Sequence, residues 1–546
     1  MPRWEPQRNR VQDGNPRTFR TTLLMNRSPS DIHPASRSAA PLRSTARWQS
    51  VWGVTVLFTV ALSVMFVLLS HVPLWHTDLW GHLQYGEILC TEKAIPATEP
   101  IMPLAAGVPF VDSAWLSQVI AFKVFESAGV AGLQCLYAAC ITACCGLLLW
   151  LSHRHGRGPV ISLAAVAVWL ALEWQQLPVI RPQLAGAVCF LALLTCLSQR
   201  RYSVSVFVIV TGLMLLWANL HGSFIMGLGL LSCFTLGRAI DVVRRSKRLT
   251  AIAHDTKTRQ LLVLTLCGGL AVFVNPYGPQ LYFHVLTFAR NPNLADLTEW
   301  KLLSFTSQQG QIFAAAVIFL IPMLYFSPRR ITTAEILLLT GLGAATVWTS
   351  RMIVWFAPIA AYVFALHGGA LWNRYVFHPR PRPLGTPRRN WARTTLVAVA
   401  IMTAGAFSPL GRLIWSGPPV DFNAAVSSQT PVAAAEFLLE RQPAGQMFNT
   451  YEWGDYLSWV GHRHAQRWPI YVASHAHLVP RQVWVDYMAL IGAPADWEQR
   501  LEQYDVQTVV IDHRNRSALI SRLRASDHWT LVFEDDIAAI FIRKHP

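Results

Sequence analysis

The feature that most constrains this chain is a set of apolar runs long enough to cross a lipid bilayer. The run at 51–70 contains no charged residue over about 20 positions, the length that spans a hydrocarbon core. A soluble helix of this length usually carries a polar stripe, and this run shows none. Charged residues make up 14% of the 546 residues, against about 25% in soluble proteins. The chain is therefore predicted to be an integral membrane protein.

Further apolar runs lie at 129–151, 159–174, 184–198, 203–219, 222–237, 260–275, 311–325, 332–348, 352–367 and 394–411. Together with the first run, they predict an all-α membrane domain of about eleven transmembrane helices within residues 49–411.

The loops between these runs alternate in charge. Lys and Arg concentrate in the loops 152–158, 199–203, 238–259, 327–330 and 368–393. Because basic residues accumulate in cytoplasmic loops, these five loops and the N-terminus are predicted to be cytoplasmic. We expect a multi-pass protein of the inner (cell) membrane, and an odd number of spans places the C-terminal residues outside.

The two ends of the chain differ from this pattern. Residues 1–48 are rich in Arg, Pro and Ser and are predicted to form a disordered basic cytoplasmic tail. Within residues 412–546, four strand-length runs alternate with amphipathic stretches, which predicts a small extracytoplasmic α/β domain. The predicted strands are 468–474, 507–512, 530–535 and 537–543, and the predicted helices are 431–440, 496–504 and 518–526.

The net charge of +16 does not indicate a nucleic-acid partner. The arginines lie in the tail and the short loops, and no basic stripe is interleaved with stacking aromatic residues. Eight of the nine cysteines lie in or beside apolar runs, which argues against a disulfide framework or a cysteine metal site.

Polar residues gather at the predicted non-cytoplasmic ends of the helices: Asp78, His82, Arg181, Asn219, His221, Glu299 and Arg351. Carboxylates, cations and amides on one membrane face are typical of a site for an anionic, partly lipidic ligand, since polar groups at the bilayer are by default functional candidates. Simpler roles stay open. Asp78 also suits a helix N-cap, Arg181 and Arg351 suit contacts with lipid headgroups, and His221 suits bonds to backbone carbonyls.

Two H-x-H pairs, His462 with His464 and His475 with His477, suggest a metal if they lie on strands. No carboxylate or cysteine completes the set nearby in sequence, so no metal ligand is assigned. A divalent metal is left open as a cofactor.

Several short motifs, 78-DLWGHLQYGEI-88, 109-PFVDSAWLSQ-118, 181-RPQ-183, 217-WANLHG-222, 275-NPYG-278 and 451-YEWGDY-456, carry a family resemblance. They resemble the motifs of bacterial multi-pass proteins related to the GT-C superfamily of glycosyltransferases, which use polyprenyl-phosphate sugars.

The resemblance implies transfer of a sugar from a polyprenyl-phosphate donor to a glycan, lipid or protein acceptor outside the membrane. By the same resemblance, Asp78 is the catalytic general base or acceptor-orienting group, and Arg181, His221 and Arg351 bind the carrier phosphate. The sequence departs from the pattern at Ala114, where an acidic or amide residue is expected. Asp112 then remains as a second carboxylate.

The C-terminal domain is expected to bind or position the acceptor without being catalytic. The alternative function is non-catalytic, that of a transporter or an assembly subunit for lipid-linked glycans. A transporter needs polar groups along a path through the bilayer, and the apolar runs hold few, Glu335 being an exception.

Overall fold

The computed structural model describes residues 45–155, 158–376, 391–415, 421–442 and 445–544. The chain divides into two compact units, Met1–Val51 and Trp52–Pro546, and the second contains the functional site. Most of the predicted tail, residues 1–44, lies outside the described residues.

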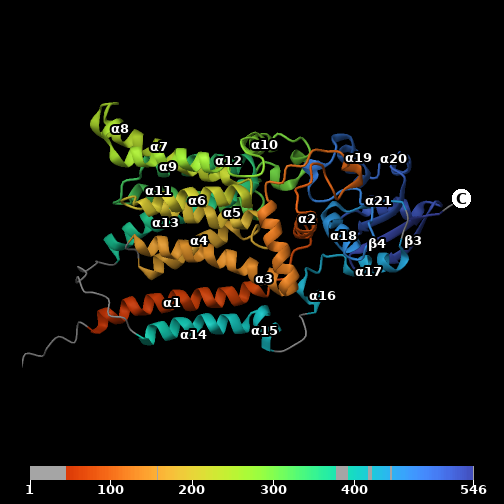
Figure 1. The fold of residues 1–546 in the computed structure, drawn as a ribbon, viewed down its shortest axis with the longest axis horizontal. Helices are drawn as coiled ribbons and strands as arrows, with labels where there is room; N and C mark the ends of the chain where they lie inside the picture. The colour runs from red at the N-terminus through yellow and green to blue at the C-terminus, as the bar shows by residue number, and fades with distance from the viewer. Residues whose placement is uncertain (1–44, 156–157, 377–390, 416–420, 443–444, 545–546) are drawn as a thin grey trace, which may run out of the picture. The chain divides into compact units, whose positions relative to one another are not determined.

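Helices that run side by side form the apolar part of the chain (Figure 1). They are α1 (Thr45–Ser70), α3 (Trp115–Arg154), α4 (Pro159–Glu173), α5 (Gln183–Leu197), α6 (Val204–Leu220), α7 (Phe224–Ser246), α9 (Thr256–Ala271), α11 (Gln308–Phe326), α12 (Thr333–Trp348), α13 (Ile353–Tyr375) and α14 (Trp391–Phe407). Each of the eleven predicted apolar runs lies largely within one of these helices. α13 is the central helix, since 78% of its apolar window is buried, against 6% for α1.

Among the described residues, five helices are long and apolar enough to cross a membrane by themselves: α1, α3, α7, α11 and α13. A sixth span arises if α14 and α15 (Pro409–Trp415), which meet at an angle of 78°, are taken together. Four further apolar helices are shorter, namely α4, α5, α6 and α12. The chain is thus a multi-pass membrane protein, and the count of eleven spans stays a prediction.

Two of the predicted runs have local features that the pattern did not show. The run at 394–411 is not one helix, because Pro409 has no amide hydrogen to continue α14 and the chain bends by 78° into α15. A Cβ on Gly411 would lie 2.2 Å from the Gly405 carbonyl oxygen, so the bend requires glycine. In α3, Gly129 has φ 57° and ψ −149°, which divides this helix into two segments.

Short elements build the end of the bundle that faces the C-terminal domain. They are α2 (Leu79–Glu92), η1 (Pro103–Ala105), α10 (Gln280–Phe288), η2 (Leu294–Asp296), η3 (Thr298–Trp300) and η4 (Ser350–Met352). At the other end, α8 (Ala251–His254) connects α7 and α9.

The C-terminal residues form the predicted α/β domain. Its sheet has the order β1-β2-β4-β3, with β1 (Gln446–Asn449) parallel to β2 (Val506–Asp512) and β4 (Ala538–Arg543) antiparallel to both β2 and β3 (Trp529–Glu534). Its helices are α16 (Phe422–Ala425), α17 (Val432–Arg441), α18 (Tyr451–Arg463), η5 (Ala476–Leu478), α19 (Arg481–Ile491), α20 (Trp497–Gln503) and α21 (Ser517–Ala525).

One predicted strand is wrong. Residues 468–474 form only an isolated bridge, between Ile470 and Met447. Two backbone groups of this segment bond to the Asn449 side chain, which accepts from the Tyr471 amide at 2.9 Å and donates to the Val472 carbonyl at 2.8 Å. β1, α18 and α19 were not predicted.

The domain packs on α2 and on the loop after it. Trp80 of α2 is fully buried against the Tyr456 ring, with ring centroids 5.2 Å apart. Asn293 of the loop after α10 donates to the carbonyls of Ala476 and Val479, at 2.8 and 2.7 Å. These contacts hold the segment around residue 475 close to the end of the bundle.

Candidate functional site

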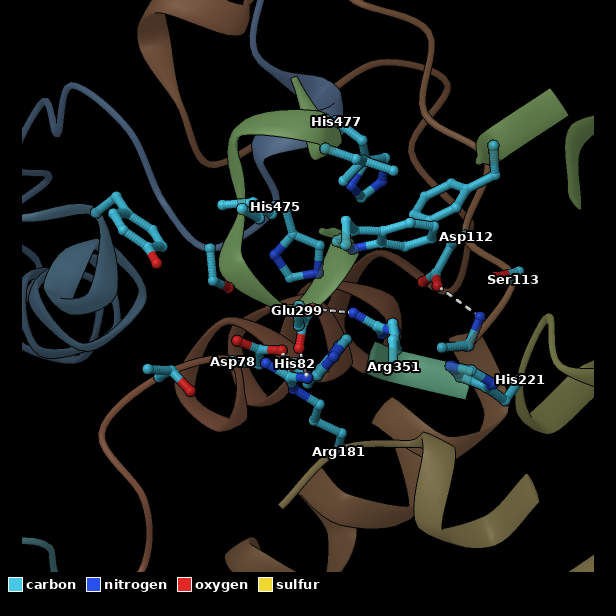
Figure 2. A pocket seen from close by; sticks show the side chains of 18 of the residues that line it. Asp78, His82, Asp112, Ser113, Arg181, His221, Glu299, Arg351, His475 and His477 are labelled. Atoms are coloured by element: carbon cyan, nitrogen blue, oxygen red, sulfur yellow. Dashed lines mark hydrogen bonds and ion pairs between the residues drawn. The ribbon is translucent and has the colours of Figure 1, made fainter. Parts of the chain in front are cut away.

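A cavity of about 320 Å³ lies between the end of the bundle and the C-terminal domain (Figure 2). Seven of the eight residues singled out from the sequence line it: Asp78, His82, Asp112, Arg181, His221, Glu299 and Arg351. They come from separate segments, namely the start of α2, the loops before α3 and α5, the turn between α6 and α7, η3 and η4.

Four of these side chains form a chain of alternating charge. Arg181 Nε lies 2.5 Å from Asp78 Oδ2, and Arg181 Nη1 donates to Glu299 Oε2 at 2.7 Å. The other oxygen of Glu299 accepts from Arg351, whose guanidinium also stacks 5.3 Å from the Trp300 ring centroid. Asp78 precedes α2, yet its side chain makes no capping bond to that helix. The structure therefore favours an electrostatic role of Asp78 over the N-cap alternative.

These ion pairs set the protonation of the carboxylates. Burial raises the pKa of Asp78, but the charge of Arg181, with smaller contributions from neighbouring histidines, outweighs burial and lowers the pKa well below its usual range. For Glu299, burial is likewise outweighed by Arg351 and Arg181, and the pKa is lowered. Both carboxylates are ionised at neutral pH.

Asp112 lies in a different environment. Its Oδ1 accepts from the Ala114 amide at 3.0 Å and from Gln118 Nε2 at 3.1 Å, while its buried Oδ2 has no hydrogen-bond partner among the residues that the structure describes. The same Gln118 nitrogen lies 3.2 Å from His82 Nδ1. Burial raises the pKa of the Asp112 carboxyl to about 7. A buried carboxylate with a raised pKa beside a cavity is a candidate functional group.

His221 does not carry the positive charge implied by the family resemblance. Burial, together with Arg351 and Arg181, lowers the pKa of His221 to about 3. Its Nδ1 accepts from the Ser223 amide at 3.1 Å, so the proton of the neutral ring is assigned to Nε2. His221 is therefore able to donate a hydrogen bond to a ligand, but only as a neutral group.

Asn219 is the one candidate that does not line the cavity. Its amide oxygen accepts from Trp115 Nε1 at 3.1 Å, and its amide nitrogen donates to the carbonyls of Leu215 and Val274. These bonds join α6 to α3 and to the end of α9, which is a structural role.

Sequence reasoning missed the part of the cavity that the C-terminal domain contributes: Tyr451, Glu452, Ser474, His475 and His477. The first two open one of the quoted motifs, and the two histidines form one of the H-x-H pairs. The other pair points elsewhere, since His462 lies 3.5 Å from Glu87 and His464 bonds to the Val460 carbonyl.

No metal site accompanies these histidines. In the part of the chain that the structure describes, no three His, Cys, Asp or Glu side chains are grouped so that they could hold a metal ion.

No protein-family model and no curated protein sequence matches the chain. Among solved structures, the arabinofuranosyltransferase AftD from Mycobacteria matches with a TM-score of 0.51 and 13% identity, over 90% of this chain and 40% of that one. The oligosaccharyltransferase AglB from Archaeoglobus fulgidus, solved with an inhibitory peptide and a dolichol-phosphate, matches with a TM-score of 0.50 and 11% identity, over 85% of this chain and 70% of that one.

The fold resembles that of the GT-C glycosyltransferases. The resemblance expected from the sequence motifs is thereby confirmed at the level of the fold. The chain spans less than half the length of the arabinofuranosyltransferase that it matches. Its own activity and substrates are proposals at this level of identity.

Proposed function

We propose that the protein is a membrane glycosyltransferase that moves a sugar from a polyprenyl-phosphate donor to an extracytoplasmic acceptor. The observation that carries this proposal is the chain of ionised side chains from Asp78 to Arg351, which lines a cavity between the bundle and the outer domain. Transfer from a lipid phosphate needs fixed positive charge where the leaving phosphate develops charge, and it needs groups that orient the acceptor hydroxyl.

Arg351 and Arg181 are proposed to bind the donor phosphate. Arginine suits this role because its planar guanidinium offers several donors to phosphate oxygens. Glu299 lies between both arginines and pairs with each of them. His221, neutral and protonated on Nε2, adds a hydrogen-bond donor beside Arg351.

Asp78 is proposed to be the catalytic carboxylate that orients the acceptor hydroxyl and stabilises positive charge developing on the sugar. Its pairing with Arg181 keeps it ionised, which favours this role over that of proton acceptor, because a general base works best with a pKa near the working pH. His82 and Asp112 extend this wall of the cavity and are proposed to contact the substrate.

The cavity is proposed to open on the extracytoplasmic side of the membrane, where it meets both the donor and the acceptor. Two of the basic loops, 199–203 and 238–259, meet at the other end of the bundle, where Lys257 donates to the Gln199 carbonyl at 3.0 Å. This supports a cytoplasmic N-terminus, an inner-membrane location and an extracytoplasmic C-terminal domain. A glycan, a lipid and a protein remain the acceptor classes; AglB, with its bound peptide, illustrates the last.

The test uses the purified full-length protein in lipid nanodiscs. Mass spectrometry of copurified lipids is expected to find a polyprenyl-phosphate sugar, and a panel of undecaprenyl-phosphate pentoses and hexoses then serves to measure turnover. Asp78→Asn keeps the shape of the side chain and removes its charge, so turnover per folded molecule is expected to fall by about 10² or more.

The matched control is Asp241→Asn, which changes a carboxylate of α7 that bonds to Thr333 away from the cavity. Its turnover per folded molecule is expected to equal that of the wild type. Wild-type turnover in Asp78→Asn, or equal losses in the two variants, would remove Asp78 from the chemistry.

A further inference from the structure

A further carboxylate, Asp455, lies close to the cavity on the side of the C-terminal domain. Asp455 of α18 is 1% exposed, and its Oδ2 accepts from the Ser474 amide at 3.2 Å. Its Oδ1 packs against α2, where a Cβ on Gly81 would lie 2.2 Å from it. Glycine at position 81 is therefore what allows Asp455 to come between the domain and the membrane part.

The buried Asp455 oxygen faces a histidine that lines the cavity. His475 Nδ1 lies 3.7 Å from Asp455 Oδ1, and neither atom has a hydrogen-bond partner among the described residues. This distance is longer than a hydrogen bond, as is common at catalytic sites without substrate. The Asp455 carboxylate favours the tautomer of the neutral ring that carries its proton on Nδ1, and this tautomer leaves a lone pair on Nε2.

The other side of the His475 ring has access to the cavity. Nε2 makes no hydrogen bond within the described residues and is not among their buried unpartnered atoms. Asp112 differs, since its Oδ1 is already bonded and its Oδ2 is buried. His475 is therefore better placed than Asp112 to meet a substrate proton.

Several titratable groups face His475: Asp455, Asp78, His82, Tyr85, Glu99, Asp112 and His477. The rings of His82 and Tyr85 lie 5.0 and 5.1 Å away, edge to face. Burial lowers the pKa of His475, but Asp455, Asp78 and Glu99 together outweigh burial and raise it above the ordinary 6.5. The neutral form, which can accept a proton, therefore becomes the major form only at a higher pH than for an ordinary histidine.

We propose that His475 is the catalytic base that takes the proton of the acceptor hydroxyl, and that Asp455 is its positioning residue. This inference rests on the proposed sugar transfer. In the step, the acceptor oxygen forms a bond to the anomeric carbon while the carbon–oxygen bond to phosphate breaks. The electron pair of that bond leaves with the polyprenyl phosphate, and the hydroxyl proton passes to His475 Nε2. The C-terminal domain then takes part in the chemistry, which sequence reasoning did not expect.

The first experiment follows the histidine itself. Full-length protein with ¹³C-labelled histidine is titrated in nanodiscs by NMR, and the His475 signal is assigned by its loss in His475→Gln. The pKa of His475 is expected to lie above the ordinary value, to fall in Asp455→Asn, and to rise when undecaprenyl phosphate is added, because a phosphate charge favours the imidazolium. An unchanged titration in Asp455→Asn, or no response to bound lipid, would overturn the proposal.

The second experiment measures turnover of the undecaprenyl-phosphate sugars with water as acceptor. Turnover by the wild type is expected to rise with pH through the pKa of His475. In Asp455→Asn, this rise of turnover should occur at lower pH. His475→Gln should lose about 10²–10⁴ in turnover, while its affinity for undecaprenyl phosphate, measured at a pH above the pKa of His475, stays the same as that of the wild type. The control His464→Gln, outside the cavity, should have the wild-type turnover and the wild-type dependence of turnover on pH.

The two proposals fail in different ways. If undecaprenyl phosphate binds but neither the signal nor the turnover depends on His475, only the role of His475 is wrong. If the lipid does not bind to the wild type, the proposed transferase function is wrong, and the role of His475 falls with it.

Discussion

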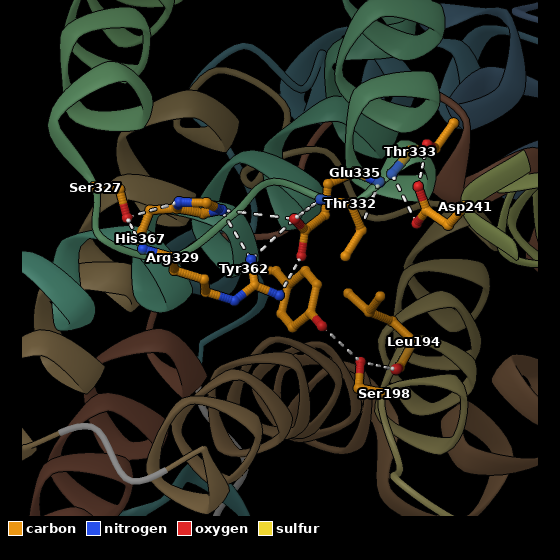
Figure 3. Close-up of polar contacts among 10 residues, drawn as sticks. All are labelled: Leu194, Ser198, Asp241, Ser327, Arg329, Thr332, Thr333, Glu335, Tyr362 and His367. Carbon is orange, nitrogen blue, oxygen red and sulfur yellow. Dashed lines mark hydrogen bonds and ion pairs between the residues drawn. The ribbon is translucent and has the colours of Figure 1, made fainter. Parts of the chain in front are cut away.

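Each end of the bundle contains a carboxylate that lies between two cationic or imidazole side chains. The two clusters differ in whether the polar groups around them have hydrogen-bond partners. Near the C-terminal domain, Glu299 pairs with Arg181 and Arg351 at the wall of a cavity. At the start of α12, Glu335 pairs with Arg329 at 2.7 Å and lies 3.5 Å from His367 (Figure 3). The 16 residues of α12 separate them by about 24 Å.

The remote cluster satisfies its own polar groups. One Glu335 oxygen accepts from Arg329, and the other accepts from Arg329 and from the Thr332 amide, which completes a capping box. Within the described part of the chain, buried groups around the cavity, such as Asp112 Oδ2 and His475 Nδ1, have no hydrogen-bond partner. Residue types alone therefore do not separate a structural cluster from a candidate site. What separates them is whether the polar groups have spare bonding capacity next to a cavity.

The largest expected effect concerns the remote cluster. Glu335→Gln removes the charge that pairs with Arg329, and breaking a buried ion pair in this way costs about 3–5 kcal/mol. The unfolding midpoint in detergent should fall, while undecaprenyl phosphate binding per folded molecule stays at the wild-type value. Wild-type stability in this variant would show that the ion pair between Glu335 and Arg329 does not stabilise the fold.

Asp112→Asn, at the cavity, should raise the stability of the folded protein, whereas Glu335→Gln should lower it. Because the folded pKa of about 7 lies above the ordinary 3.8, the folded protein loses stability as pH rises from about 4 to 7. Asparagine lacks this titration, so the variant should gain stability over the wild type across that window. At one pKa unit per about 1.4 kcal/mol, the gain is at most about 4 kcal/mol. A pH-independent difference between the two proteins would contradict the burial argument.

The smallest effect is expected for Glu299→Gln, the counterpart of Glu335→Gln. Removing the negative charge between Arg181 and Arg351 should strengthen undecaprenyl phosphate binding by about 1 kcal/mol, or roughly fivefold. Isothermal titration calorimetry of the protein in nanodiscs measures this change in affinity. Weaker binding would mean that Glu299 positions the arginines and that their neutralisation is unimportant.

Much of the part of the cavity that the helix bundle contributes could be predicted, because successive loops alternate between the two ends of the bundle. In a bundle of antiparallel helices, every second loop lies at the same end, so Asp78, Arg181, Glu299 and Arg351 were expected together. The sequence also singled out Glu335 as an ionisable group in an apolar run, but not that Arg329 and Thr332 would pair with it.

The rest depended on tertiary contacts that no short pattern contains. His475 reaches the cavity only because the domain packs on α2, with Gly81 making room for Asp455. Asn219 looked like a ligand-binding amide at a helix end, since its true partner, Trp115, lies about a hundred residues earlier. The apolar segment 468–474 looked like a strand, but the Asn449 side chain bonds to two of its backbone groups, the Tyr471 amide and the Val472 carbonyl.

The most direct test of the account compares Arg351→Gln with Arg329→Gln in binding of undecaprenyl phosphate to nanodisc-embedded protein. A hydrogen bond between charged groups contributes about 1.5–3 kcal/mol, so Arg351→Gln should weaken binding by roughly 10- to 100-fold. Arg329→Gln should lower stability and leave the affinity of the folded fraction unchanged. Wild-type affinity in Arg351→Gln, or the same loss in both variants, would contradict the assignment of the cavity cluster as the phosphate site.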